Sequence, residues 1–365
     1  MDKERASQLL WLRAETKAHE ARTPLTPGDA ARLLRQGFRI VVERSEDRVF
    51  PDGDYQSAGC ELVAAGSWVA APEEAFILGI KELPEDETPL GHRHIYFAHA
   101  YKEQTGWREI LRRFKSGGGR LYDIEYLVDE NGQRVVAFSY WAGYAGCAVG
   151  VMAWCGQQLG ESPPLAHLHP YPDKGEMLDD LREMLAYAEN KAGRKPEVFI
   201  IGAKGRVGSG AADLARALDL KTICWDKEET ARGGPFREIL DHDIFINGVL
   251  LSKPIPPFVT FDMLQAPARR LSVISDVSCD PNSEHNPLPV YDFCTTFAEP
   301  SWRVVEGDTP LDLIAIDHLP TFVPKESSEE FSGQLVEFLA QLDAPDRGVW
   351  GGAGEVFEQK IALLD

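Results

Sequence analysis

A glycine-rich turn between an apolar run and a helical pattern carries the most specific chemistry in this sequence. Residues 198–201 form the apolar run, and four glycines follow between positions 202 and 210. A strand, a glycine turn and a helix in this order place backbone N–H groups where a pyrophosphate can approach closely. The next apolar run ends at Asp226, whose carboxylate would bind ribose hydroxyls and repel a 2′-phosphate. A merely tight turn would not explain the acid, so the sequence predicts NAD binding.

Two further apolar runs end in side chains that can exchange protons, Lys81 and His99. In open α/β sheets, ligands bind beyond the carboxyl ends of the strands, so these residues could face one cleft. A partly desolvated lysine could act as a base, and histidine transfers protons near neutral pH. The alternative is that Lys81 is a solvated strand end and His99 a hydrogen-bonded core residue.

Other candidate residues are cationic or acidic side chains near strand ends. Arg22 and Arg134 carry guanidinium groups, whose fork geometry suits bidentate carboxylate binding, although either could be an ordinary surface arginine. Asp317 and His318 follow the apolar run 314–316. Their alternative interpretation is a strand-terminal turn that Pro320 stops.

Composition and charge favour a soluble enzyme of two domains. The chain has 365 residues, of which 44% are hydrophobic and 26% charged. Its net charge of −20 argues against general binding to nucleic acids or anionic membranes. The six cysteines show no metal-binding spacing, so we expect reduced thiols, a cytoplasmic location and no metal site.

One uncharged stretch, residues 135–160, raises the alternative of a membrane span. It contains the small-residue spacing Gly146–Gly150, which lets membrane helices pack closely. However, Gly143 and Gly156 interrupt it, and it also holds polar side chains. We expect a buried helix between two domains.

The rest of the chain alternates strand and helix patterns, which implies parallel sheets covered by helices. In the first part we expect strands at 9–12, 38–43, 75–80, 94–98, 121–127 and 134–138, and helices at 27–35 and 104–114. Later we expect a helix at 174–192, strands at 243–248, 271–277 and 311–316, and a closing helix at 328–342. The fold class predicted is α/β, with two doubly wound, Rossmann-like parallel-sheet domains.

Several sequence blocks resemble those of a known family. They include Leu12-Arg-Ala-Glu-Thr-Lys17 with Glu20-Ala-Arg22, Gly79-Ile-Lys-Glu82, Phe97-Ala-His-Ala-Tyr-Lys102, Gly202-Ala-Lys-Gly-Arg206 and Ile316-Asp-His-Leu-Pro320. Collinear blocks from about residue 12 to 342 resemble the NAD-dependent, lysine-forming saccharopine dehydrogenases. The resemblance implies the fold of alanine dehydrogenase and the transhydrogenase nucleotide-binding subunit, with the active site in an interdomain cleft.

The resemblance also implies a reaction and its participants. The reaction is the reversible, NAD-dependent oxidative deamination of saccharopine to lysine and 2-oxoglutarate, in lysine biosynthesis by the alpha-aminoadipate pathway. The partners would be these small molecules, without nucleic acid or membrane, and the protein a monomer or small homo-oligomer. A substrate domain would comprise residues 1–134 with 321–365, and an NAD domain residues 135–320.

Individual residues receive roles from the same resemblance. Lys81 would deprotonate the substrate amine, His99 would serve imine hydrolysis, and Asp317 would lie beside the nicotinamide. Substrate-binding residues would be Arg22, Lys81, Arg134, Phe138, Ser278, Cys279 and Asp280. NAD-binding residues would be Gln104, Gly205, Arg206, Asp226, Thr230, Val277, Ile316, Asp317, His318 and Leu319.

The chain also departs from the family pattern. Gln133 replaces an arginine that contacts NAD in fungal members, and Leu250 replaces a tyrosine beside the adenine. Val207 and Gly248 replace a cysteine pair, so redox control is not expected. Two alternatives remain: another opine or amino-acid dehydrogenase of this fold, such as an alanine dehydrogenase, and a non-catalytic NAD-binding regulator.

Overall fold

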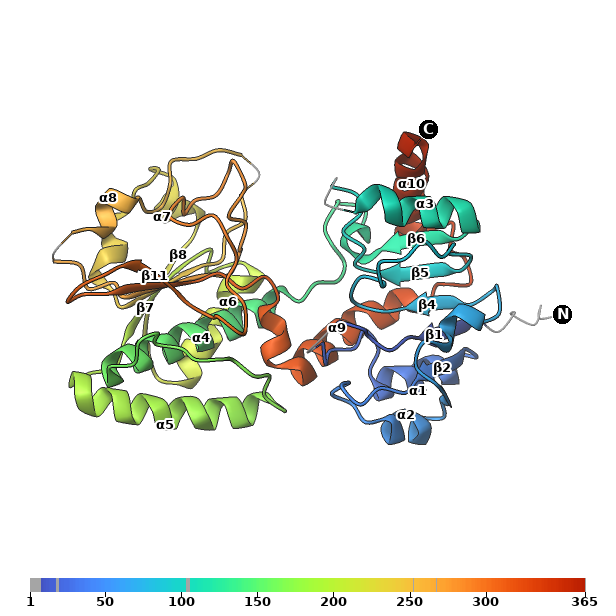
Figure 1. Ribbon diagram of the computed structural model, residues 1–365, viewed down its shortest axis with the longest axis horizontal. Helices are drawn as coiled ribbons and strands as arrows, with labels where there is room; N and C mark the ends of the chain where they lie inside the picture. The colour runs from blue at the N-terminus through green and yellow to red at the C-terminus, as the bar shows by residue number, and fades with distance from the viewer. Residues whose placement is uncertain (1–7, 18–19, 103–105, 252, 267, 365) are drawn as a thin grey trace. The chain divides into compact units, whose positions relative to one another are not determined.

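The structure is a computed structural model that describes residues 8–17, 20–102, 106–251, 253–266 and 268–364. The chain forms two compact units, Met1–Ala137 with Pro324–Asp365, and Phe138–Val323. Each unit contains a six-stranded sheet (Figure 1). The C-terminal segment therefore belongs to the same unit as the N-terminal third of the chain.

The sheet of the first unit has the strand order β3-β2-β1-β4-β5-β6, and every neighbouring pair is parallel. Its strands are β1 (Leu9–Leu12), β2 (Arg39–Glu43), β3 (Glu61–Val63), β4 (Phe76–Leu78), β5 (Arg93–Tyr96) and β6 (Arg120–Asp123). Because all six strands run the same way, their carboxyl ends lie along one edge of the sheet. Lys81 and His99 follow β4 and β5 at that edge.

Helices and short 3-10 turns complete the first unit. They are α1 (Pro27–Arg35), α2 (Asp52–Ala58), η1 (Ser67–Ala70), α3 (Trp107–Gly117), η2 (Ile124–Tyr126), α9 (Pro324–Leu339), α10 (Gly348–Ile361) and η5 (Ala362–Leu364). Backbone N–H groups of Thr23 and Thr26 each donate to a serine hydroxyl on α9, Ser328 and Ser332, at 2.9 Å. These buried bonds join the C-terminal segment to the N-terminal one.

The sheet of the second unit has the order β11-β12-β10-β9-β7-β8. Its strands are β7 (Glu197–Ile201), β8 (Lys221–Trp225), β9 (Ile244–Asn247), β10 (Val273–Asp276), β11 (Trp302–Val305) and β12 (Leu311–Ile314). The pairings are parallel except that β11 runs antiparallel to β12. Strand β8 lies on one side of β7, and the next strand in the sequence, β9, lies on the other side. The strand order therefore changes direction at β7. Such a switch point is where open α/β sheets bind ligands.

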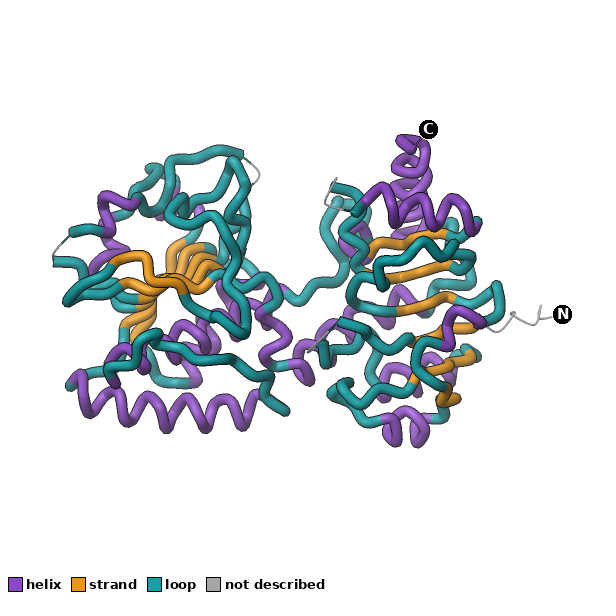
Figure 2. Tube along the Cα trace, viewed as in Figure 1, coloured by secondary structure: helices purple, strands orange, loops and turns teal. Residues whose placement is uncertain are grey.

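Alternate residues of β7 face two different cores. Val198 and Ile200 join a cluster with α4 (Ser139–Leu159), α5 (Lys174–Ala192) and α6 (Arg206–Ala217). Phe199 and Ile201 join a cluster on the opposite face, as the two-residue period of a strand requires. Loops make up much of that second layer (Figure 2), together with α7 (Lys227–Thr230), η3 (Arg237–Asp241) and α8 (Phe261–Leu264).

Helix α4 accounts for the uncharged stretch of the sequence, and it is buried in the core of the second unit. Glycines allow α4 and α6 to approach closely, because a Cβ at Gly143 or Gly210 would overlap backbone atoms of the other helix. None of the helices in the described part of the chain combines the length and apolar composition needed to cross a membrane.

The strand expected at 134–138 is wrong. Arg134 makes only an isolated bridge with Val128, and α4 begins at Ser139. The strand expected at 121–127 ends early, at Asp123, because the Asp123 carboxylate accepts the N–H of Glu125 at 3.0 Å and caps η2.

We predict that Gly210→Ala destabilises the second unit. Alanine in a helix interior gains about 1 kcal/mol over glycine, but overpacking a tight contact costs about 1–3 kcal/mol. Because the added Cβ would overlap the carbonyl oxygen of Tyr140, we expect a lower Tm in thermal unfolding. The control is Gly333→Ala in α9, where no atom crowds the added Cβ. A Gly210→Ala protein with an unchanged or raised Tm would refute the close contact.

Candidate active site

Proton-transfer groups gather at the carboxyl edge of the first sheet. Lys81 and Glu82 follow β4, and His99 follows β5, so parallel pairing brings them to the same edge. The His99 Nε2 atom lies 3.5 Å from the Glu82 carboxylate. The Phe97 ring stacks on His99 with their centroids 6.4 Å apart. His99 also has a positive φ of 51°, which is uncommon for a residue with a side chain and typical of functional sites.

The surroundings of Lys81 and His99 favour their neutral forms. Burial lowers the pKa of Lys81, and the Arg22 guanidinium lowers this pKa further, while Glu20 opposes the shift. Burial also lowers the pKa of His99, against the opposing charges of Glu82 and Glu125. A lysine and a histidine that both lose protons more readily than usual are suited to base chemistry near neutral pH.

Arg22 is bound to a carboxylate of its own chain. Its Nε and Nη2 atoms donate to the two oxygens of Glu20 at 2.8 and 2.5 Å, and both side chains are 3% exposed. Burial alone would raise the pKa of Glu20, but Arg22 and Lys81 hold that pKa below its usual value. Glu20 therefore stays ionised beside Lys81. Glu20 was not identified as a candidate from the sequence, although it lies in the block Glu20-Ala-Arg22.

Arg134 presents a more accessible guanidinium than Arg22. Its side chain is 42% exposed, 3.8 Å from the Glu125 carboxylate and above the Phe97 ring. Glu125 also accepts a hydrogen bond from Lys102 at 2.7 Å. Lys102 and Glu125 were missed as candidates because neither directly ends an apolar run. Of the two predicted arginines, Arg134 has the geometry to meet an incoming carboxylate.

The glycine turn of the second unit forms as the sequence predicts. Gly202 has φ 86°, Gly205 is the N-cap of α6, and a Cβ at Gly208 would overlap the carbonyl oxygen of Gly202. The turn thus requires the absence of side chains, and it leaves the N-terminus of α6 open to close approach. This geometry fits the phosphates of a dinucleotide. Arg206, the first residue of α6, is exposed there.

Asp226 lies at the end of β8, next to this turn. Its two carboxylate oxygens accept the N–H groups of Lys204 and Lys227, each at 2.8 Å, and these bonds lower its pKa. The Thr230 hydroxyl donates to the Asp226 carbonyl oxygen at 2.8 Å. The carboxylate is therefore ionised and fixed beside the glycine turn, where a ribose would be recognised.

A polar network fixes the loop that follows β10. Asn247 donates through its Nδ2 to Asp276 at 2.9 Å and to Ser278 at 2.8 Å. The Tyr291 hydroxyl donates to the other oxygen of Asp276 at 2.6 Å. Val277 lies buried within this loop, and Cys279 has a positive φ of 45°. The Sγ atom of Cys279 lies 3.3 Å from that of Cys294.

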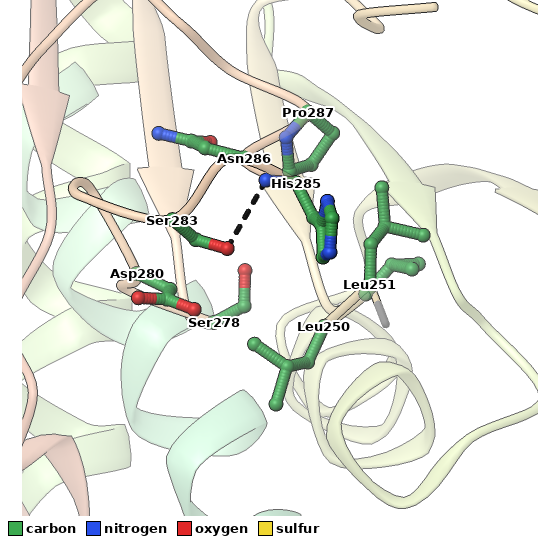
Figure 3. A pocket seen from close by; sticks show the side chains of 9 residues that line it. Leu250, Leu251, Ser278, Asp280, Ser283, His285, Asn286 and Pro287 are labelled. Carbon is green, nitrogen blue, oxygen red and sulfur yellow. Dashed lines mark hydrogen bonds between the residues drawn. The ribbon is translucent and has the colours of Figure 1, made fainter. Parts of the chain in front are cut away.

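A shallow pocket lies beyond the ends of β9 and β10. Ser278 and Asp280 line one side of it, across from Leu251 and His285 (Figure 3). The backbone N–H of His285 donates to the Ser283 hydroxyl at 3.1 Å. The pocket is also lined by Leu250, where the sequence departs from the family pattern.

Most of the remaining predicted residues belong to the second unit. Asp317 and His318 are hydrogen-bonded neighbours beyond β12, with Asp317 largely exposed and the His318 ring stacked on Phe297. Ile316 and Leu319 are buried on either side of them. Phe138 is the N-cap of α4, so it belongs to the second unit while Arg134 belongs to the first. Gln104 lies outside the described residues.

Comparisons of the sequence and of the structure both find similar known proteins. Residues 11–145 match the family described as alanine dehydrogenase/PNT, N-terminal domain. Over 97% of this chain and 98% of the other, the sequence is 48% identical to a Yarrowia lipolytica protein called saccharopine dehydrogenase (NAD(+), L-lysine-forming). An Emericella nidulans protein of the same name is 47% identical over 98% of both chains. A solved L-alanine dehydrogenase covers 98% of this chain and 100% of its own, with a TM-score of 0.67 and 15% identity.

We predict that Glu20→Gln lowers the pKa of Lys81 further. Removing the negative charge takes away an interaction that favours the protonated lysine, while the Arg22 charge remains. Competitive labelling of amines with acetic anhydride across a pH series, read by peptide mass spectrometry, gives this pKa. Breaking a buried pair costs about 3–5 kcal/mol, so the Tm should fall as well. A Lys81 pKa that rises in the variant would show that Glu20 does not act on Lys81 as described.

Proposed function

The chain belongs to the family of NAD-dependent, lysine-forming saccharopine dehydrogenases, and we propose that Lys81 and His99 carry the proton transfers of the reaction. The enzyme oxidises saccharopine with NAD and water, giving lysine, 2-oxoglutarate, NADH and a proton. The observation that supports these roles is the convergence of Lys81 and His99 at one sheet edge, where burial lowers the pKa of both side chains.

Lys81 is assigned to the first proton transfer. Saccharopine is lysine joined through its ε-nitrogen to the α-carbon of a glutamate. Its secondary amine must be neutral before the carbon–nitrogen bond is oxidised, because an ammonium has no lone pair to drive the loss of hydride. A lysine whose pKa is lowered can accept that proton near neutral pH. Bound NAD supplies the acceptor for the hydride.

His99 is assigned to the hydrolytic half of the reaction. Water adds to the substrate imine, and the resulting carbinolamine loses its amine as lysine. These steps move protons from oxygen to nitrogen, which suits a histidine near neutrality. Glu82, 3.5 Å from His99, stabilises the protonated ring that forms during such a transfer.

Arg134 is assigned to a substrate carboxylate. Saccharopine carries three carboxylates, and a partly exposed guanidinium at the same edge as Lys81 can bind one of them bidentately. Arg22 is already paired with Glu20, so it acts on the substrate mainly through its charge. Phe138, Ser278, Cys279 and Asp280 stay predicted contacts from the second unit.

The second unit is proposed to hold NAD. The glycine turn with Gly205 and Arg206 would receive the pyrophosphate, and Asp226 would bind the adenosine ribose. Thr230, Val277 and the segment 316–319 complete the proposed cofactor site, with Asp317 beside the nicotinamide. The first unit is then the substrate domain, and the cleft between domains expected from the resemblance stays a prediction.

Location and partners are proposed on chemical grounds. All six cysteines are free thiols in the structure, which fits a reducing compartment such as the cytoplasm. The net charge of −20 disfavours nucleic acid or anionic membranes as partners. Arg134 and Lys102, two partly exposed cations that share the Glu125 carboxylate, are the side chains proposed to meet anionic substrates at this edge.

We predict that Lys81 and His99 affect different steps. In single-turnover oxidation of saccharopine, Lys81→Met should slow NADH formation by about a hundredfold or more, because the amine loses its base. His99→Gln should slow release of lysine and 2-oxoglutarate more than NADH formation. Stopped-flow absorbance and quenched-flow product analysis measure the two steps.

The controls for this pair are cofactor affinity and folding. NADH titration should give the wild-type Kd in both variants, because neither residue lies in the second unit. Circular dichroism checks that each variant is folded. Wild-type NADH formation by folded Lys81→Met protein would disprove the base assignment.

We predict that Arg134→Ala raises the KM for 2-oxoglutarate. A hydrogen bond to a charged group contributes about 1.5–3 kcal/mol, which corresponds to a roughly ten- to a hundredfold change. Steady-state NADH oxidation with lysine and 2-oxoglutarate gives the KM. The matched control is Arg112→Ala, which removes an exposed arginine paired with Glu109 on α3. Equal KM values in the two variants would place the substrate carboxylate elsewhere.

A further inference from the structure

The backbone around Lys81 is held by side chains, although Lys81 itself lies beyond the regular sheet. The last backbone bond between the extensions of β1 and β4 runs from the Arg13 N–H to the Leu78 carbonyl at 3.0 Å. Beyond it, the Glu15 carboxylate accepts the N–H of Ile80 at 2.6 Å and the N–H of Lys81 at 3.0 Å. Where the sheet ends, the Glu15 carboxylate thus accepts the backbone N–H groups that a neighbouring strand would otherwise bind.

Arg13 binds the carbonyl group of Lys81. Its guanidinium donates to the carbonyl oxygen of Lys81 and, at 3.2 Å, to the Glu15 carboxylate. The peptide groups before and after Lys81 are therefore both bonded to this one ion pair. Charge-assisted hydrogen bonds of this kind are shorter and stronger than neutral ones.

The Arg13–Glu15 pair is buried, with side chains 1% and 7% exposed. Burying two charges has a desolvation cost that their attraction does not always offset, so such a pair is weak evidence for stability. Gly79 makes room for it, because a Cβ at that position would overlap the guanidinium. The pair, the glycine and the two N–H bonds form one arrangement around Lys81.

We propose that Arg13 and Glu15 are positioning residues that fix the backbone of Lys81 and so aim its amine at the substrate. This inference builds on the proposed role of Lys81 as the base. It differs from the role of Glu20 and Arg22, whose charges modify the pKa that burial lowers at Lys81. A base displaced by about 1 Å can lose a hundredfold in rate even when its pKa is unchanged.

The test compares Glu15→Gln and Arg13→Lys with the wild-type enzyme in steady-state oxidation of saccharopine by NAD. Glu15→Gln keeps one acceptor oxygen but loses the charge, and Arg13→Lys keeps the charge but not the fork. We expect kcat to fall about ten- to a hundredfold in both, with KM for saccharopine and Kd for NADH nearly unchanged. Glu15→Asp, which retracts the carboxylate by one methylene, should give an intermediate kcat and serves if the other variants do not fold.

A second readout separates positioning from electrostatics and from loss of stability. In protein labelled with ¹³C-lysine, the Cε resonance of Lys81, assigned by its absence in Lys81→Met, gives the lysine pKa, which we expect to be unchanged. The matched control pair is Arg48→Lys and Asp52→Asn. Arg48 is also buried in the first unit, and it donates to a backbone carbonyl, that of Glu43, and lies 3.6 Å from Asp52.

Three results would overturn the proposal. The first is wild-type kcat in folded Glu15→Gln and Arg13→Lys proteins. The second is an equal loss of kcat in the Arg48 and Asp52 controls, which would indicate general destabilisation. The third is a shift of the Lys81 pKa that accounts for the whole loss. If the wild-type chain itself does not oxidise saccharopine, the proposed function fails first; an active wild-type enzyme with unaffected variants removes the positioning role alone.

Discussion

The desolvation of Lys81 at the carboxyl edge of the first sheet is the constraint on which the account of the site depends. Burial lowers the pKa of this lysine, and the buried Glu20–Arg22 pair moderates the shift, because Arg22 lowers the pKa further while Glu20 raises it. The parallel strands bring His99 to the same edge, and the Arg13–Glu15 pair fixes the backbone of Lys81. One buried ion pair thus influences the pKa of Lys81, and a different buried ion pair fixes the position of its backbone.

Much of the architecture could be predicted because buried parallel strands are short apolar runs that end in turns. Lys81, His99 and Asp226 stood out for the same reason, since each follows such a run. The run 134–138 misled because its apolar residues lead into the buried helix α4 instead of a sheet. Strand β3 has three half-exposed or exposed residues, and β11 is an edge strand with one buried residue, so neither gives a clear apolar signal.

Side-chain pairing was much harder to predict than the fold. Two residues apart in sequence, Glu20 and Arg22 could each face solvent, and only the packing of the first unit buries them together. The same holds for Arg13 and Glu15, whose role depends on where β4 ends. The shared fold with L-alanine dehydrogenase, at 15% identity, shows how little the sheet order alone says about the substrate. The residues at the sheet edges carry that information.

The most direct test of the account is NADH oxidation by the purified chain with paired keto acids and amines. A site built to form and cleave a secondary amine between two amino acids should turn over 2-oxoglutarate with lysine. Pyruvate with ammonia, the pair expected of an alanine dehydrogenase, should give little or no NADH oxidation. Efficient turnover of pyruvate with ammonia, and none of 2-oxoglutarate with lysine, would contradict the account.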